Sequence, residues 1–417
     1  MKNAWAKKRL GDVVTRLTNG YVGPTRNIYL ESGVPYLLAR HVRDNQLAFD
    51  GKTFVSDEFN LKHKKSMLKA GDVLLVQSGH IGHSAVVSEE HEGHNCHAMI
   101  VITPVKDAVT GRFLSLYFNS PRMQEGFDKI RSGSTVPHLT CRAVKEVSIP
   151  LPPLPEQRRI VGILDEACDG IATARANAEK NLQNARALFE SHLQAVFTNA
   201  ATQYPTKRLK GLCERITKGS SPKWQGISYV DQPGVLFVTS ENVQEHRVVI
   251  ASPKYVEEKF NDKDKRSILK RGDVLTNLVG ASIGRTAVFE LDDNANINQA
   301  VGVVTCVPDL LHNYYLMFLF NSPFMKRFFH DNEVNNARAN ISLTFLKELH
   351  IPLPSVECQK STVAQIREFH EQSERLESIY QRKLAALDEL KKSLLHQAFS
   401  GNLSKTAVNK PSEMTTS

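Results

Sequence analysis

The segment IPLPPLPEQRRIVGILDEA, residues 149–167, reappears as IPLPSVECQKSTVAQIREF at residues 351–369. In both copies the prolines fix the backbone φ angle and force the residues before them into extended conformations, so IPLPPLP and IPLPSVE are not expected to be helical. From Glu156 and from Cys358 onward the chain has no proline until Pro205 and Pro411. The pattern predicts an extended segment that leads into a long helix, twice in one chain.

Further matching segments show that the whole chain is an internal repeat. KRLGDVVTRLTNG from Lys8 matches KRLKGLCERITKG from Lys207, and SMLKAGDVLL from Ser66 matches SILKRGDVLT from Ser267. A repeat of roughly 200 residues is long enough for each copy to form a core of its own. We therefore expect two copies of one architecture, each with a globular part and a helical tail.

The globular part of each copy has the pattern of a mixed α/β domain with short strands. Residues 71–79 and 272–280 start at a Gly-Asp turn and continue into a β-branched apolar run, which predicts a turn followed by a buried strand. Further strands are expected at 98–105 and 300–308. Residues 114–130 and 314–330 contain a central Asn-Ser-Pro, where serine can cap a helix and proline can occupy its first position, so we predict two helices around a tight turn.

Each helical tail carries an apolar stripe with heptad spacing, which is typical of a coiled coil. The residues predicted to pair the helices are Ile160, Leu164, Ile171, Leu182 and Phe189 in the first tail and Val363, Ile366, Leu376, Tyr380, Leu387 and Leu394 in the second. We expect the two tails to form an antiparallel coiled coil about a pseudo-twofold axis, with the globular parts at opposite ends. The alternative is that each helix packs on its own globular neighbour.

These features predict the organisation of the chain. A globular domain is expected at residues 1–150, an extended segment with a central spacer helix at 151–200, a second globular domain at 201–352, and a second such segment and helix at 353–402. A straight helix from Glu156 to Phe197 would be roughly 60 Å long. Residues 403–417 have the composition of a disordered tail.

Composition narrows the function classes. The 417 residues include 53 Lys plus Arg against 44 Asp plus Glu, a net charge of +9, and the excess lies in residues 1–150 and 201–352. A polyanionic partner fits this distribution, and so does an ordinary basic surface. The sequence has neither a long apolar run nor a signal peptide, so we expect a cytoplasmic protein without a membrane span. The six cysteines form no CxxC pair and are expected to be reduced.

No familiar catalytic motif is present. The sequence lacks a GxxxxGK[ST] loop, a GxGxxG loop after a strand, a GxSxG elbow and an HExxH helix. His91, His94, Cys96 and His97 have a spacing that could hold zinc, but the second copy reads NANINQA there and offers no such ligands. We therefore expect no metal and interpret this stretch as a polar recognition loop or an ordinary surface loop.

Together, the repeated IPLP segment, Gln157 and Gln359, the LKxGDVL strands and the helix ends LQAVF and LLHQAFSG closely resemble the specificity subunits of type I restriction-modification systems. The resemblance covers essentially the whole chain. It implies that each globular part is a target recognition domain for half of a gapped, asymmetric double-stranded DNA sequence. The second copy departs from the pattern at SVECQ, where the first has PLPEQ, which weakens the implied docking surface there.

The resemblance also implies partners. The paired helices would act as a ruler and would dock two adenine methyltransferase subunits, which restriction subunits with a DNA translocase would join. S-adenosylmethionine, ATP and magnesium would be bound by those partner subunits, and this chain would hold no cofactor and carry no catalysis.

The residues expected to contact DNA lie in polar loops where the two copies differ. Arginine suits guanine, asparagine or glutamine suits adenine, and lysine suits phosphate. In the first copy the candidates are Arg40, His41, Arg43, Lys64, Lys65, Gln77, His80, His83, Asn95, His97, Arg131, Ser134, Thr135 and His138, with Lys62 and His94 beside them. In the second copy they are Lys223, Trp224, Gln225, Asn242, Gln244, Lys265, Arg266, Asn277, Arg285, Asn298, Gln299, Asn335, Asn336, Arg338 and Asn340, with Lys263 and Asn296 beside them.

Two other functions remain open from the sequence. The chain could be a nuclease or methyltransferase in its own right, or a scaffold whose basic domains bind proteins. The first would modify DNA unaided, and the second would bind DNA without regard to sequence.

Overall fold

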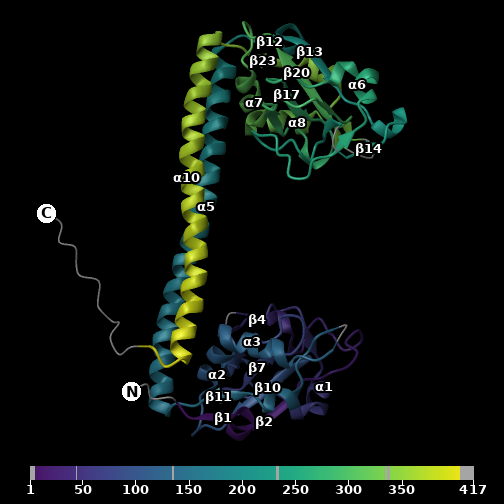
Figure 1. Ribbon diagram of the computed structural model, residues 1–417. Coiled ribbons are helices and arrows are strands. Elements are labelled where there is room, and N and C mark those ends of the chain that lie inside the picture. Colours follow the sequence, from purple (N-terminus) through teal and green to yellow (C-terminus); the bar gives the residue numbers. More distant parts are fainter. Residues whose placement is uncertain are drawn as a thin grey trace, which may run out of the picture. The chain divides into compact units, whose positions relative to one another are not determined.

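The computed structural model describes residues 5–43, 45–133, 136–231, 234–332 and 340–403, together with the backbone of residues 334, 335 and 339. The chain divides into two compact units, Met1–Ala178 with Arg382–Ser417, and Glu179–Gln381. Each unit contains one globular domain and part of each of the two long helices (Figure 1).

The first unit is built on an antiparallel sheet in the order β2-β10-β7-β8. These strands are Val14–Asn19 (β2), Met99–Pro104 (β10), Val73–Val76 (β7) and Ser84–Val86 (β8). β7 and β10 confirm the strands predicted at 71–79 and 98–105. Alternate residues of β7 enter two different cores, Val73 and Leu75 on one face and Leu74 and Val76 on the other. Both faces of this strand are therefore covered, as its continuous apolar run requires.

Smaller elements cover the two faces of this sheet. Helices α2 (Gly111–Phe118) and α3 (Pro121–Ile130) contribute to one core and confirm the predicted helix, turn and helix. A second sheet adjoins the other core, with the strand order β6-β3-β9 and a parallel pair β3-β9. Its strands are Val34–Leu37 (β3), Phe54–Val55 (β6) and Asn95–Cys96 (β9). The remaining elements are β1 (Lys7–Arg9) paired with β11 (Ser148–Pro150), the hairpin β4 (Val42–Arg43) and β5 (Gln46–Leu47), α1 (Asp57–Lys62) and α4 (Cys141–Lys145).

The second unit repeats this frame. Its main sheet has the order β13-β20-β17-β18, with strands Cys213–Lys218, Val301–Cys306, Val274–Asn277 and Thr286–Val288. β17 and β20 confirm the strands predicted at 272–280 and 300–308, and α7 (Asn313–Asn321) and α8 (Pro323–Asp331) confirm the second helix pair. The smaller sheet has the order β14-β16-β15-β19, with strands Tyr229–Val230, Tyr255–Val256, Val235–Val238 and Ala295–Ile297. The remaining elements are β12 (Thr206–Arg208) paired with β23 (His350–Pro352), β21 (Val334–Asn335) paired with β22 (Ala339–Asn340), α6 (Lys259–Lys263) and α9 (Leu343–Glu348).

The Asn-Ser-Pro turns differ in one detail between the units. Ser322 caps α8, since its hydroxyl accepts a hydrogen bond from the backbone N–H of Met325 at 3.2 Å. The hydroxyls of Ser120 and Ser322 both donate to the carbonyl three residues before them, of Tyr117 and Leu319, each at 2.6 Å, but Ser120 makes no capping bond to α3. The predicted serine cap is therefore present in the second unit only, while proline opens the helix in both.

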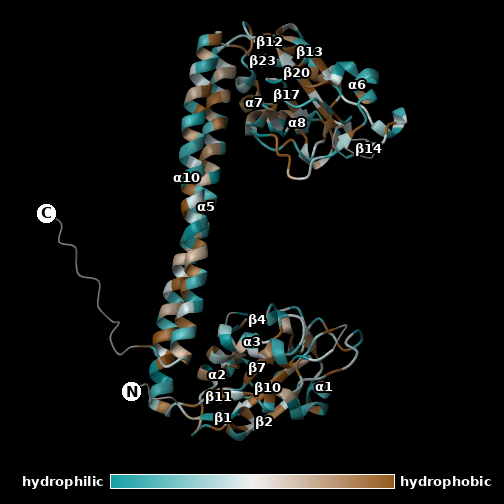
Figure 2. Cartoon of the chain, viewed as in Figure 1, coloured by the Kyte–Doolittle hydropathy of each residue, from teal (hydrophilic) through white to brown (hydrophobic). Residues whose placement is uncertain are grey.

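The long helices α5 (Leu154–Gln203) and α10 (Val356–Phe399) begin earlier than predicted. Pro155 lies in the first turn of α5, and Val356 and Glu357 lie in α10, so the prediction that IPLPPLP and IPLPSVE contain no helix was wrong at their ends. A proline is tolerated in the first turn because its missing N–H would have no partner within the helix. Apolar and polar residues mix along the length of both helices (Figure 2).

Within each unit α5 and α10 pack against one another in an antiparallel manner. In the first unit Ile160 and Leu164 share a core with Leu395 and Phe399, and Arg175 forms an ion pair with Asp388 farther along. In the second unit the hydroxyl of Ser373 donates to the carbonyl of Ala185 at 2.8 Å, Arg186 pairs with Glu377 at 2.8 Å, and the rings of Phe189 and Phe369 stack. Residue numbers rise along α5 as they fall along α10, so the predicted pairing is confirmed within each unit.

The apolar stripe is less regular than a strict heptad predicts. Ile160, Leu164, Ile171, Phe189, Val363 and Ile366 are buried, and Leu182, Tyr380, Leu387 and Leu394 are half-buried. Leu376, also predicted to pair the helices, is 40% exposed, while Ser373 is buried beside α5. A straight helix drifts away from a seven-residue repeat, which moves successive positions off the contact line.

Each long helix also packs on a globular domain at both of its ends. The ring of Phe399, at the end of α10, contacts Phe113 and Tyr117 in the first unit at 5.4 and 5.1 Å between centroids. The ring of Phe197, near the end of α5, contacts Tyr315 in the second unit at 5.4 Å. The alternative that each helix packs only on its own neighbour is therefore wrong.

The repeated glutamines lock the start of each long helix onto its domain. Gln157 is fully buried, and its side-chain carbonyl accepts from the N–H of Thr110 at 3.0 Å. Its amide nitrogen donates to the carbonyls of Ala108 and Pro152, both at 2.9 Å. Gln359 makes the same three bonds in the second unit. Because each amide satisfies three buried backbone groups, the repeated PEQ and ECQ motifs have a structural cause.

None of the helices in the described ranges is long and apolar enough to cross a membrane.

Candidate nucleic-acid interface

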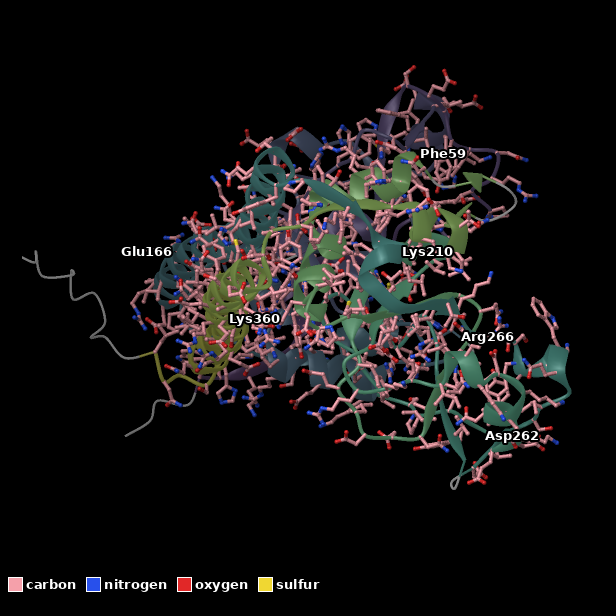
Figure 3. The ribbon with its side chains drawn as sticks, turned by 90° about the horizontal axis from the view of Figure 1, so that it is seen from above. Phe59, Glu166, Lys210, Asp262, Arg266 and Lys360 are labelled. Atoms are coloured by element: carbon pink, nitrogen blue, oxygen red, sulfur yellow. The ribbon has the colours of Figure 1, made fainter. Side chains whose placement is uncertain are left out.

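A basic turn precedes the central strand in each unit. In the first unit this turn contains Lys64 and Lys65, and in the second Lys265 and Arg266; all four side chains are exposed. Lys62 and Lys263, at the ends of α1 and α6, are exposed beside them, and Arg266 lies in the same part of the second unit as Asp262 of α6 (Figure 3). Exposed cations on a short rigid turn are suited to phosphate contacts.

A half-buried arginine and a buried aspartate hold each basic turn in place. Arg16 donates to the carbonyls of Lys65 and Met67 at 3.3 and 2.8 Å and forms an ion pair with Asp72, whose side chain is fully buried. Arg215 donates in the same way to Arg266 and Ile268, at 3.0 and 2.9 Å, and pairs with Asp273 at 2.6 Å. This role could not be predicted from sequence patterns, because the arginine lies more than forty residues from the turn it holds.

Asparagines at the start of β9 and β19 also support these turns. The Asn95 amide is fully buried and donates to the carbonyl of His63 at 3.1 Å. The Asn296 amide is fully buried too and donates to the carbonyl of Asp264 at 3.1 Å. Because both are fully buried and serve the same structural purpose in the two copies, bases cannot reach them.

Two of the predicted polar clusters meet at one place in each unit. In the first, the segment that follows β7 pairs with His138 and Leu139: Ser78 bridges to His138, and the N–H of Leu139 donates to the carbonyl of Gln77 at 2.8 Å. In the second, Val279 bridges to Asn340, and the N–H of Ile341 donates to the carbonyl of Leu278 at 2.8 Å. Each unit thus has a composite loop, formed by the segment after β7 or β17 and the second segment that pairs with it. The two composite loops carry different side chains.

Members of these loops differ in accessibility. His80 and Arg131 are exposed, and His83 and His138 are half-buried, whereas Gln77 is only 9% exposed. In the second unit Asn277 is fully buried and donates to the carbonyls of Ser240 and Val243 at 3.0 and 3.2 Å. Gln77 and Asn277 therefore face the protein interior. Ser134, Thr135, Asn336 and Arg338, and the side chain of Asn335, lie outside the described residues.

The hairpin that follows β3 holds the first cluster. Arg40 and Arg43 are exposed, and Arg40 pairs with Asp50 at 2.9 Å. His41 is buried, and its Nδ1 accepts from the N–H of Leu38 at 3.0 Å. Burial lowers the pKa of His41, and the hydrogen bond from Arg40 lowers the pKa of Asp50 to about 2. His41 thus supports the turn, and the arginines are the members of this cluster that a base could reach.

In the second unit the structure brings together candidates that are distant in sequence. A guanidinium nitrogen of Arg285 donates to the side-chain oxygen of Gln244 at 3.4 Å, and both side chains are half-buried. Asn242 is used locally, since its Oδ1 accepts from the N–H of Thr239 at 2.9 Å. Asn298 accepts from the N–H of Ala300 at 3.1 Å, and Gln299 is half-buried beside it.

The residues whose spacing could hold zinc, for which no metal was expected, make other contacts. Cys96 is fully buried, the His97 ring lies 6.3 Å from Tyr21 and 6.3 Å from Tyr36, and the rings of His91 and His94 are 5.6 Å apart. In the described ranges no three His, Cys, Asp or Glu side chains form a group that could hold a metal ion.

Trp224 stands out among the candidates because its side chain is 79% exposed. It lies in the short helix Pro222–Gln225, between Lys223 and Gln225. Hydrogen bonds connect this helix to α6 and to the residue before the basic turn: Lys263 donates to the carbonyl of Gln225 at 2.6 Å, and Gln225 donates to Ser220 at 2.5 Å. The hydroxyl of Ser220 donates in turn to Asp264 at 2.6 Å. A large exposed ring on a basic, well-supported turn can stack on bases or sugars.

Binding of DNA should therefore change the fluorescence of Trp224. The chain has two tryptophans, so the variant Trp5→Phe leaves Trp224 as the only one. We expect a titration with target duplex to quench its emission by roughly a third or more, because a base stacked on the indole ring quenches its excited state on contact. Trp224→Phe, which leaves Trp5 in the first unit, is the matched control and should respond weakly. Unchanged Trp224 emission at saturation would remove this residue from the interface.

Comparisons with known proteins agree with the repeat. The family model of the type I restriction modification DNA specificity domain matches residues 2–181 and again residues 203–382. A specificity subunit of a type I restriction enzyme from Escherichia coli, EcoBI, is 24% identical over 319 residues, which cover 72% of this chain and 67% of the relative. The MjaVIII specificity subunit from Methanocaldococcus jannaschii is 21% identical over 421 residues and covers 97% of this chain and 94% of its own length.

A solved structure shares the fold. A chain from a study of complex assembly and conformational transition in a type I restriction-modification system superposes with a TM-score of 0.75 at 21% identity. The alignment covers 96% of this chain and 99% of that chain. The mixed α/β repeat with long helices is thus a known architecture.

Proposed function

The chain belongs to the family of type I restriction modification DNA specificity domains, and we propose that its two globular domains each read one half of a bipartite DNA site. The relatives that it matches are specificity subunits of type I restriction enzymes. The observation that carries the proposal is the duplicated frame: the same sheet, basic turn and composite loop occur twice, but with different side chains on the loops.

This arrangement meets the physical requirements of sequence reading. Phosphate contacts set the position of a protein on DNA, and contacts to base edges select the sequence. The basic turns would supply the first, and the exposed members of the loops, such as Arg43, Arg131 and Trp224, would supply the second. A single domain covers only a few base pairs, so a long site needs two readers.

The paired helices would set the distance between the two readers. The helix α5 has 50 residues, so it is about 75 Å long at 1.5 Å per residue. Half-sites that face the same side of a duplex are separated by about 34 Å, or a multiple of it. We propose residues 1–150 and 201–352 as the reading domains and residues 151–200 and 353–402 as the spacer.

The chemistry would belong to partner subunits. We propose that the spacer docks two adenine methyltransferase subunits in the cytoplasm, and that restriction subunits with a translocase join them. S-adenosylmethionine, ATP and magnesium would be bound by these partners. In this proposal the chain contributes specificity and no catalytic group.

A purified sample distinguishes this function from its rivals. With duplex DNA, magnesium and S-adenosylmethionine, the chain alone should leave the DNA unmodified, and methylation should begin when the methyltransferase subunits are added. An unlabelled duplex that keeps the target should displace the bound DNA. A shuffled duplex that lacks the target should not. Modification by the chain alone would establish an enzyme, and binding indifferent to sequence would support a scaffold that binds proteins.

A further inference from the structure

Each globular domain has a hairpin tip that reaches toward the spacer helices. We call Arg43, Asn45 and Gln46 in the first domain, and Gln244–Arg247 in the second, the hairpin tips. Asn45 in the first tip and His246 in the second have φ angles of 63° and 68°, in the left-handed region that residues other than glycine rarely adopt. Each tip lies beside the edge strand of its sheet: Asn45 bridges to Ala85, and the N–H of His246 donates to the carbonyl of Thr286 at 3.0 Å.

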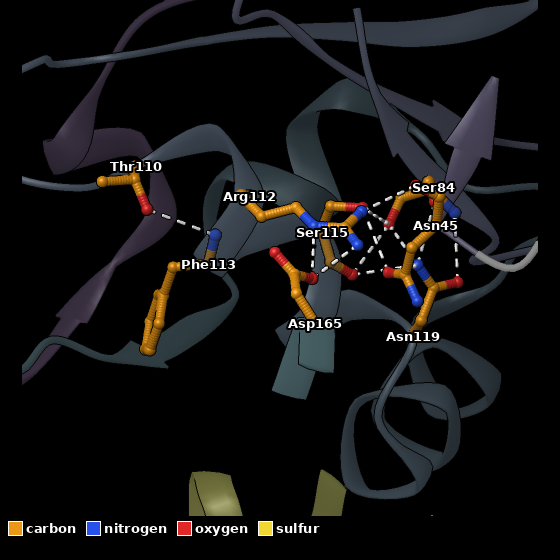
Figure 4. A network of polar contacts seen from close by, with 8 residues as sticks. All are labelled: Asn45, Ser84, Thr110, Arg112, Phe113, Ser115, Asn119 and Asp165. Atoms are coloured by element: carbon orange, nitrogen blue, oxygen red, sulfur yellow. Dashed lines mark hydrogen bonds and ion pairs between the residues drawn. The ribbon is translucent and has the colours of Figure 1, made fainter. Parts of the chain in front are cut away.

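The first tip is fixed to α5 through Arg112 of α2. One guanidinium nitrogen of Arg112 donates to the backbone carbonyl of Asn45 at 2.8 Å. The other two nitrogens donate to Oδ1 of Asp165 on α5, at 2.9 and 2.6 Å (Figure 4). A single side chain therefore ties the tip of the hairpin to the spacer.

The side chain of Asn45 is held by α2 and by the residue that follows it. Its Oδ1 accepts from the amide of Asn119 at 2.6 Å and from the hydroxyl of Ser115 at 3.2 Å (Figure 4). Asn119 donates in addition to the carbonyl of Ser84 on β8 at 2.9 Å. The tip, the edge strand and α2 thus form one polar network, and Arg112 extends that network to the spacer.

The second tip meets the spacer through aromatic contacts instead. The ring of His246 lies 5.6 Å from Phe189 on α5, 5.2 Å from His370 on α10 and 5.4 Å from Phe318 on α7. Burial lowers the pKa of His246 to about 3, so the imidazole is neutral at physiological pH and packs as an apolar ring. The two copies therefore use different chemistry to make one contact, between a strained tip and the long helices.

We propose that the hairpin tips are positioning contacts, which fix the orientation of each reading domain on the spacer and so select the length of the unread gap. This inference rests on the proposed function. Arg40 and Arg43 lie on the first hairpin, and Gln244 with Arg285 lies at the second, so each tip connects reading side chains directly to the helices.

A small rotation at the tip would be enough to change the gap. A domain of about 150 residues has a radius of roughly 20 Å. A rotation of about 10° would then move its outer surface by about 3.5 Å, close to the rise of one base pair. Helix length alone would therefore leave the gap uncertain by a base pair unless the domain is held against rotation.

The test compares gap discrimination with half-site binding. The variants are Arg112→Ala, Asp165→Ala and the double variant in the full chain, assembled with its methyltransferase subunits. The substrates are duplexes that carry both half-sites at the preferred gap, or at one base pair more or fewer, and duplexes with one half-site. Arg122→Ala, an exposed arginine on the neighbouring helix α3, is the matched control.

We expect each single variant to reduce the preference for the correct gap by about ten-fold and to leave half-site affinity unchanged, since only the placement of an intact reader is altered. The double variant should lose no more than either single variant, because both remove the same contact. His246→Ala should have a similar effect through the second unit, and Arg122→Ala should have none.

Two results would overturn the inference. The first is unchanged gap preference in folded variants. The second is an equal loss for half-site and full-site duplexes, which would mean that Arg112 only maintains the fold of its own domain. A wild-type chain that prefers no pair of half-sites would instead overturn the proposed function itself, and the half-site arm of the experiment shows which of the two has failed.

Discussion

Insertion of seven residues into both α5 and α10 is expected to widen the unread gap by about three base pairs, since seven residues add roughly 10 Å to a helix. The insertions belong after Ala178 in α5 and after Gln381 in α10, where the two compact units meet along the chain. One heptad preserves the face that each helix presents to the other, so the apolar stripe stays in register. Methylation of a duplex series with gaps of increasing length measures the shift.

Single insertions provide the control for this experiment. Seven residues added to α5 alone would shift its side chains out of register with those of α10. Ala185, for example, would no longer lie beside Ser373, and Arg186 would no longer lie beside Glu377. We expect such chains to lose methylation at every gap length. If the double insertion left the preferred gap unchanged, the helices would not determine the distance between the readers.

Asp72→Ala is expected to destabilise the first globular domain by about 3–5 kcal/mol, the range for removal of one partner of a buried ion pair. The carboxylate of Asp72 is fully buried and pairs with Arg16, and it also accepts from the hydroxyl of Thr103 at 2.6 Å and from the N–H of Lys69 at 2.8 Å. Its removal leaves the guanidinium of Arg16 without its counter-charge and the basic turn without support.

Urea unfolding of the full chain, followed by hydrogen exchange, measures this loss and locates it. Exchange should accelerate in β7 and β10 of the first unit, while the second unit, which has its own pair Arg215–Asp273, should be unaffected. Glu146→Ala is the control, because Glu146 is 63% exposed and pairs with Arg9 at the surface, where such a pair contributes about 0–1 kcal/mol. A loss under 1 kcal/mol in Asp72→Ala would show that the buried pair does not hold the domain together.

The repeat and the main helices and strands could be predicted because the sequence patterns that indicate them depend only on nearby residues. The Gly-Asp turns before β7 and β17, the prolines before the long helices and the Asn-Ser-Pro turns each act within a few residues, so the repeat and the main elements could be predicted from the sequence. The start of α5 was displaced because a helix tolerates proline in its first turn, which allows Pro155 inside α5. The start of α10 was displaced because Ser355 caps the helix, accepting from the N–H of Cys358 at 3.3 Å, so the helix already includes Val356 and Glu357.

The interface was harder to predict because tertiary packing decides which polar side chains reach the surface. Asn95, Asn277 and Asn296 have the same residue type as a base-reading asparagine, yet all three are fully buried and bind backbone groups. The contact between Asn45 and Arg112 spans 67 positions, and its counterpart at His246 has a different chemistry. Neither could be found by comparing the two copies residue by residue, since only the backbone conformation of the tip is shared.

The most direct test of two readers at a set distance is a genome-wide map of adenine methylation. A host would express this chain with its methyltransferase subunits, and the map would be repeated after residues 1–150 are exchanged for the first domain of another specificity subunit. We predict a motif with two halves and a gap of constant length, in which the exchange alters one half and leaves the other half and the gap unchanged. A contiguous motif, or an alteration of both halves, would contradict the account.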